Sequence, residues 1–99
     1  MATINFQKIG SVASIAPGST YAFQWNNPPW GTVLGYTAYP VPQTPSGPHG
    51  IHSGSMKISN VTVTYIRDNY SGDRKYVVIE ITNTSNDTAG ADLFESWIS

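Results

Sequence analysis

In residues 74–83 the aliphatic residues Val77, Ile79 and Ile81 recur with a period of two, and this alternation constrains the fold more than any other feature of the sequence. A period of two places successive side chains on opposite faces of an extended strand, whereas an amphipathic helix needs apolar residues three or four positions apart. We therefore expect a strand here, with Val77, Ile79 and Ile81 facing the core.

The same alternation recurs in residues 20–26, where Tyr21, Phe23 and Trp25 share one face. We expect Phe23 and one of its two aromatic neighbours to be buried. The remaining chain is rich in Val, Ile, Thr, Tyr and Trp and poor in Leu, Glu and Lys, which is typical of strands. Strands are expected at residues 3–9, 12–15, 20–26, 32–39, 55–67, 74–83 and 91–98, the second either continuing the first or offset from it.

About seven short strands in 99 residues predict one domain, residues 1–99, with an all-β fold. The expected architecture is an antiparallel β-sandwich, and an immunoglobulin-like arrangement is one candidate. A chain of this length can bury one core without covalent staples. It contains no cysteine, which rules out disulfides and thiolate chemistry.

Proline and glycine mark the connections between the expected strands. The segment Ala16–Ser19 predicts a type II turn, with proline second and glycine third. Residues 20–26 and 32–39 are expected to form a hairpin with Trp30 at its tip. Residues 40–54 contain four prolines and predict a long, stiffened loop.

In two of the expected strands, the alternation does not by itself decide which residues face the core. The apolar positions slip by one residue between Ile58 and Val61, which predicts a bulge or bend at Ser59–Asn60. In the last strand, the buried pair is either Phe94 with Ile98 or Leu93 with Trp97. Residues 68–73 are expected to form a turn.

No Asp, Glu, Lys or Arg occurs from Ile9 to Met56, and all charged residues lie outside this uncharged window. The formal net charge is −1, so the chain lacks the basic stripe that phosphate binding requires, and we expect no nucleic-acid partner. The sequence contains no apolar run of about eighteen residues, so we expect no membrane-spanning segment. The first residues do not resemble a signal peptide, which leaves the cytoplasm, an export route without a Sec signal, or a removed signal as alternatives.

Catalytic motifs are absent from the sequence. Most of the six carboxylates lie in turns or near the C-terminus, where solvated surface charge is the ordinary explanation. A glycosidase-type pair assembled from different loops stays open. The sequence has neither a G-x-S-x-G elbow nor a glycine-rich phosphate loop. We therefore expect no enzymatic activity, no catalytic residues and no cofactor.

His49 and His52 have a spacing that suits zinc on a turn, but two ligands are too few for a site. The oxygen-rich turn at residues 68–73 lacks the spacing and closing glutamate of an EF-hand. We expect exposed loop histidines and an ordinary hairpin turn, with no metal.

The uncharged window predicts a neutral binding surface. Aromatic rings stack on the C–H faces of sugars while amides bond to the hydroxyls, so our first expectation is a carbohydrate-binding module or small lectin. Protein interfaces also lose charge and gain Tyr and Trp, so the alternative is an assembly module that forms a homo-oligomer or binds a protein partner. The candidate ligand-binding residues are Asn26, Asn27, Trp30, Tyr36, Tyr39, Gln43, His49 and His52.

Overall fold

The computed structural model describes residues 3–26 and 32–98, with the backbone alone for residues 32–34. Within these ranges the chain is all β and contains no helix, as the alternation predicts. Six strands are described, in place of the expected seven or so, because residues 12–15 continue the first strand. They are β1 (Ile4–Ile15), β2 (Thr20–Trp25), β3 (Thr32–Pro42), β4 (Met56–Ile66), β5 (Arg74–Asn83) and β6 (Ala89–Ile98).

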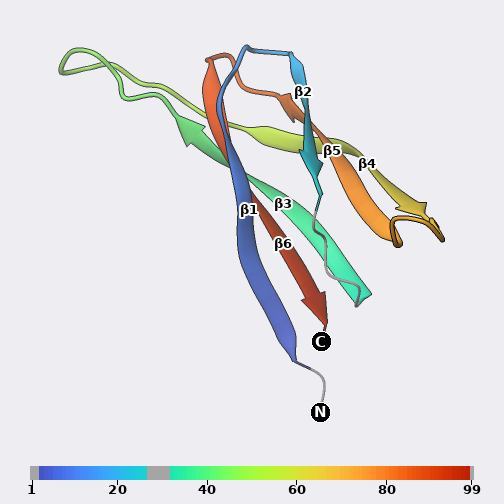
Figure 1. Ribbon diagram of the computed structural model, residues 1–99. Coiled ribbons are helices and arrows are strands. Elements are labelled where there is room, and N and C mark those ends of the chain that lie inside the picture. Colours follow the sequence, from blue (N-terminus) through green and yellow to red (C-terminus); the bar gives the residue numbers. More distant parts are fainter. Residues whose placement is uncertain (1–2, 27–31, 99) are drawn as a thin grey trace.

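The strands form two antiparallel three-stranded sheets, ordered β1–β6–β3 and β2–β5–β4 (Figure 1). The central strands, β5 and β6, are hydrogen-bonded on both sides and carry most of the fully buried residues. The inward positions predicted for β5 are confirmed, because Val77, Ile79 and Ile81 have no exposed surface. An immunoglobulin-like topology stays a prediction.

One apolar core joins the two sheets. Ile9, Val12 and Ile15 of β1 pack with the three buried residues of β5 and with Leu93 of β6. Burying a side chain of this size stabilises the fold by about 1.5–3 kcal/mol. At the margin, Phe23 and Trp25 are half-buried against this core, whereas Tyr21 is exposed. The expectation that Phe23 and one aromatic neighbour are buried is thus met only in part: Trp25 is the neighbour that packs against the core, and both rings remain half-buried.

Two predicted irregularities are confirmed. In the turn after β1, Gly18 has a φ of 75° and the Ser19 amide donates to the Ala16 carbonyl at 3.0 Å. Both features belong to a type II turn, whose third position requires a positive φ. In β4, the pairing with β5 shifts between Ile58 and Asn60, at the expected bulge. The shift keeps the apolar residues on both sides of it facing the same way.

The predicted hairpin of residues 20–26 with 32–39 is wrong. Strand β2 pairs with β5, and β3 pairs with β6, so the two segments belong to different sheets. Local alternation shows that a segment is extended, but it does not say which strand completes its hydrogen bonds. Strand β3 also continues through Pro42, further than expected, because an edge strand tolerates residues that lack an N–H donor.

The two sheets share the core at one end and diverge toward the other, where the β4–β5 hairpin separates from the lower ends of β1, β6 and β3 (Figure 1). The radius of gyration is 16.2 Å, compared with roughly 13 Å for a compact domain of about 100 residues. The accessible surface is 6380 Å², compared with about 5500 Å² for a compact monomer of this mass. The chain thus exposes more surface than its length requires.

Gly10 provides a test of the contact between the sheets. A Cβ at this position would overlap the ring of Phe23, lying 2.7 Å from its Cε2. We predict that Gly10→Ala lowers the free energy of unfolding by about 1–3 kcal/mol through overpacking. The control is Gly35→Ala, whose Cβ would meet no atom of the described residues within 4 Å. Urea denaturation that gave the two variants equal stability would contradict the contact.

Candidate functional site

The predicted ligand-binding residues do not form one cluster along β3. Asn26 directly follows β2, and the connection from there leads to the start of β3; Asn27 and Trp30 lie outside the described residues. Gln43, His49 and His52 follow the other end of β3. An eleven-residue strand spans about 35 Å. The structure therefore does not bring the loop residues together with Asn26.

Tyr36 and Tyr39 occupy opposite faces of β3, as the alternation predicts. Tyr36 pairs with Glu95 on the face toward the other sheet and is half-buried. Tyr39 pairs with Asp92 on the outer face, and 65% of its surface is exposed. Of the two tyrosines, Tyr39 is thus the one presented to a partner.

An aromatic cluster on the outer face of the β1–β6–β3 sheet surrounds Phe94. The ring of Phe6 from β1 stacks on Phe94, with centroids 5.0 Å apart and 8° between the planes. The ring of Tyr39 from β3 meets Phe94 edge-on at 6.3 Å. Three strands thus contribute one aromatic side chain each. Both ring arrangements are favoured geometries for aromatic pairs.

Aliphatic residues extend this cluster along the sheet. Ile4 lies on the same face as Phe6, two residues before it in β1, and is 72% exposed. Val41 lies two residues after Tyr39 in β3 and is also exposed. We call the five residues Ile4, Phe6, Tyr39, Val41 and Phe94 the aromatic face.

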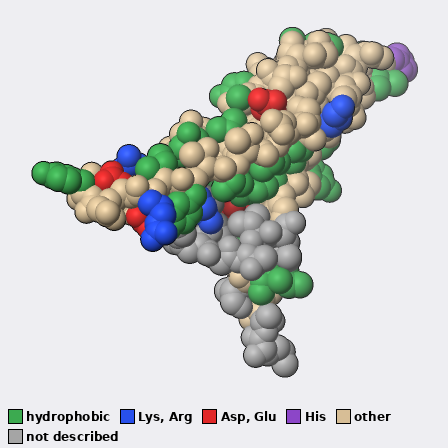
Figure 2. Space-filling model, turned by 90° about the vertical axis from the view of Figure 1, so that its right-hand side faces the viewer, with side chains coloured by type: hydrophobic (Ala, Val, Ile, Leu, Met, Phe, Trp, Pro, Cys, Tyr) green, Lys and Arg blue, Asp and Glu red, His purple; other side chains and the backbone are tan. Residues whose placement is uncertain are grey.

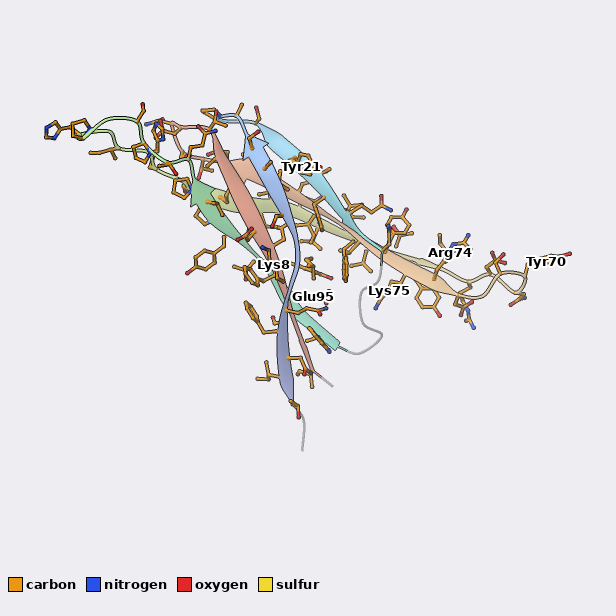
Figure 3. All side chains as sticks on the ribbon, turned by 60° about the vertical axis from the view of Figure 1, so that its left-hand side comes forward. Lys8, Tyr21, Tyr70, Arg74, Lys75 and Glu95 are labelled. Atoms are coloured by element: carbon orange, nitrogen blue, oxygen red, sulfur yellow. The ribbon has the colours of Figure 1, made fainter. Side chains whose placement is uncertain are left out.

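The charged residues beside the aromatic face neutralise one another. Lys8 and Asp92 form an ion pair at 3.4 Å, and the Ser11 hydroxyl donates to Asp92 at 2.8 Å. The hydrogen bond from Ser11, and then Lys8, hold the pKa of the Asp92 carboxyl below its usual value. Figure 3 places Lys8 on β1. This rim therefore adds hydrogen-bonding groups without net charge.

Sequence reasoning named Tyr39 but missed Phe6, and it left the orientation of Phe94 open. Of the two alternatives for β6, the pair Leu93 with Trp97 faces the other sheet, since Leu93 is fully buried and Trp97 half-buried. Phe94 consequently points outward. The available signal was the alternation of Ile4 and Phe6, which marks one apolar face of β1 but does not say which face.

Glu95 is a buried carboxylate in the space between the sheets. It has no exposed surface, and neither carboxylate oxygen has a well-aligned hydrogen bond in the described part of the chain. The Tyr36 phenol lies beside it. Burial, and then the neighbouring carboxylate, raise the pKa of Tyr36 well above its usual value. The indole Nε1 of Trp25 is also buried and has no hydrogen-bond partner among the described residues.

The long loop is anchored at both ends. The His52 Nδ1 lies 3.0 Å from the Gln43 carbonyl oxygen, which can only accept, so this nitrogen donates. The Ser53 amide donates to Asp87 at 2.9 Å. This hydrogen bond is the main cause that lowers the pKa of Asp87. Figure 2 shows histidine at one extremity of the molecule, away from most of the Lys and Arg side chains visible in that view.

The carboxylates of the turn at residues 68–73 accept hydrogen bonds from backbone amides of the same turn. Asp68 accepts from the amides of Tyr70 and Ser71, and Asp73 accepts from the Asp68 amide and the Tyr65 hydroxyl. These hydrogen bonds explain the oxygen-rich sequence as a hairpin turn. Across residues 3–26 and 32–98, no three His, Cys, Asp or Glu side chains gather as metal ligands would.

Comparison with protein-family models, curated proteins and solved structures gives no match, so the function has to be inferred from the residues of this chain. Among the described residues no helix is long and apolar enough to cross a membrane.

Glu95 yields a prediction about stability. A fully buried carboxylate with no well-aligned hydrogen bond among the described residues is destabilising, so Glu95→Gln is expected to raise the free energy of unfolding at neutral pH by about 1–3 kcal/mol. The control is Glu80→Gln, which removes a carboxylate from a half-buried position on β5. Urea denaturation measures both variants. A destabilised Glu95→Gln would show that the charge itself supports the fold.

Tyr36 yields a prediction about alkaline stability. Its pKa is raised in the folded state, so the associated stabilisation is complete below the unfolded value of 10.0 and declines as the pH rises above it. The Tyr36→Phe variant lacks this titration. We expect its urea midpoint to change less between about pH 9 and pH 11 than that of the wild type. Parallel losses in the two proteins would contradict the assignment.

Proposed function

We propose that this protein is a non-catalytic assembly module, and that its aromatic face packs against another protein surface, in the simplest case that of a second copy. The observation that carries the proposal is the exposed ring of Phe6, which stacks on Phe94 at the centre of the aromatic face. Soluble monomers rarely expose contiguous apolar patches of this kind without a binding role.

The arrangement of the rings supports binding by a prepared surface. Phe6 is 65% exposed, although a second ring already fixes its position. An aromatic residue held in one orientation loses little conformational entropy when a partner covers it. Its area then contributes to affinity, which is why aromatic residues dominate the energetics of many interfaces.

The charge distribution supports the same proposal. The centres of protein interfaces are depleted of charge, and their rims are polar. The five residues of the aromatic face are uncharged, and the Lys8–Asp92 ion pair lies beside them. The large accessible surface of the single chain is a further indication, because association would cover surface that the fold itself leaves exposed.

Ile4 and Val41 favour a protein partner over a sugar. Sugar binding depends on flat rings and hydrogen-bonding groups, and exposed aliphatic side chains add little to either. A protein surface can bury both residues, and that burial is favourable in proportion to the area removed from water.

Glycan binding is a second candidate function at the same face. Tyr39 stands beside the Phe6–Phe94 stack, and Asp92 with Ser11 supplies hydrogen-bonding groups nearby. This combination could hold a sugar ring, and it would transfer the expected lectin activity from Asn26 and the long loop to the sheet.

We also propose that the two sheets are best classed as a small β-sandwich. The apolar core shared by β1, β5 and β6 supports that class.

Substitution of Phe6 tests the proposed function. We expect the wild type to exceed the monomer mass of 10.7 kDa in light scattering at about 100 μM, and Phe6→Glu to lower its average mass by placing a charge in the contact. The control is Tyr70→Glu, at the exposed tip of the β4–β5 hairpin (Figure 3).

Two results would contradict assembly through this face. One is a Phe6→Glu variant with the mass of the wild type. The other is a monomeric wild type that binds a glycan on an array and loses that binding in Phe6→Ala, which would establish the second candidate.

A further inference from the structure

The strand edges of the two sheets are protected to different degrees. Strands β1, β2, β3 and β4 each lie at the edge of a three-stranded sheet. Unprotected edges invite pairing with another chain, and proteins commonly block them with prolines, charges, bulges or short strands. The β3 edge contains Pro40 and Pro42, the β1 edge contains Lys8 and two register shifts, and β2 has only six residues.

The second half of β4 has none of these protections. Residues 60–66, Asn-Val-Thr-Val-Thr-Tyr-Ile, contain no charge, no proline and no glycine. They pair with β5 in an unbroken register, since the bulge lies before them. Val63 is 58% exposed, and Val61 and Tyr65 on the same face are exposed as well. The segment is therefore a regular, uncharged edge with apolar side chains.

We propose that residues 60–66 of β4 pair antiparallel with the same residues of a second copy, about a twofold axis at Val63. The pairing would join the two β2–β5–β4 sheets into one continuous six-stranded sheet. It involves a different sheet from the aromatic face, and it goes beyond the proposed function by naming a second contact and its partner.

The sequence of the segment is complementary to itself in this register. Val63 of one copy lies opposite Val63 of the other, and Val61 lies opposite Tyr65, on one face of the joined sheet. Thr62 lies opposite Thr64 on the other face. Pairs of β-branched residues with aromatic residues, and of threonine with threonine, are favourable neighbours across antiparallel strands. A twofold interface requires this kind of self-complementarity.

The register also keeps like charges apart. The nearest charged residue, Arg67, would fall opposite Ser59 of the second copy, which is uncharged. A twofold axis at Thr62 would instead place Tyr65 opposite Ser59, at the bulge, and would leave part of the regular segment unpaired. The axis at Val63 uses the whole of residues 60–66.

Cysteine cross-linking tests the register directly, because the chain has no cysteine of its own. In Val63→Cys, the axis places the two thiols on directly opposite residues, whose Cα separation of about 4.5–5.5 Å suits a disulfide. We expect mild oxidation of the full chain to yield a covalent dimer. The matched control is Val61→Cys, on the same face of the same strand, whose two copies would lie roughly 13 Å apart.

The proposal predicts that Val63→Cys cross-links at least about tenfold faster than Val61→Cys, because pairing raises the effective concentration of the thiols. Equal rates for the two variants, or a rate for Val63→Cys no higher than that of Tyr70→Cys at the hairpin tip, would overturn it. Pairing of β4 with an extended peptide of another protein would give the same negative result.

A second measurement separates this contact from the aromatic face. In the Phe6→Glu background, Val63→Cys is expected to cross-link as fast as it does alone. Conversely, Val63→Lys, which puts two ammonium groups opposite each other, is expected to lower the average mass in light scattering while the protein stays folded by circular dichroism. A folded Val63→Lys variant with unchanged mass would count against the β4 contact, whatever the outcome at Phe6.

Discussion

The packing of β5 against β1 and β6 holds the molecule together. Val77, Ile79 and Ile81 meet Leu93 and the apolar residues of β1 in one core. Each three-stranded sheet buries one apolar face, and it does so against the other sheet. The positions of the turns, the buried carboxylate and the exposed surfaces follow from where this contact is made and where it ends.

The contact is limited in extent, and that limit leaves surface exposed. Three strands per sheet give two edges each, so four edges must be protected or paired. The sheets diverge away from the core, and the outer face of the β1–β6–β3 sheet retains an ordered set of aromatic rings. A chain of this kind gains more from association than a compact domain does, because association covers apolar area that the fold cannot reach.

Glu95 and Tyr36 form a polar pair in the space between the two sheets, next to the apolar core. A carboxylate without exposed surface opposes folding unless its environment compensates it. Glu95 lies on the central strand β6, beside the Tyr36 phenol, whose pKa is raised by burial and by Glu95 itself. The space between the sheets is therefore polar at this pair and apolar in the core. Stability and pH response therefore depend on a pair of residues separate from both proposed contacts.

Local sequence determined the strands, the type II turn at Ala16–Ser19 and the bulge before residues 60–66. Side-chain alternation and the backbone limits of Pro and Gly act over a few residues, and such features can be predicted without partners. The burial of Val77, Ile79 and Ile81 in β5 followed from their period of two for the same reason. The alternation expected for the strand at residues 32–39 also correctly indicated that Tyr36 and Tyr39 occupy opposite faces.

Only the tertiary structure decided which strands pair and which faces meet solvent. Both phases of β6 carry apolar residues, so the orientation of Phe94 depended on which phase packed against β5. The predicted hairpin failed because hydrogen-bond partners distant in sequence outweighed proximity along the chain. The aromatic face could not be found from the sequence, since its residues come from three strands that are brought together only by β6 pairing with β1 and with β3.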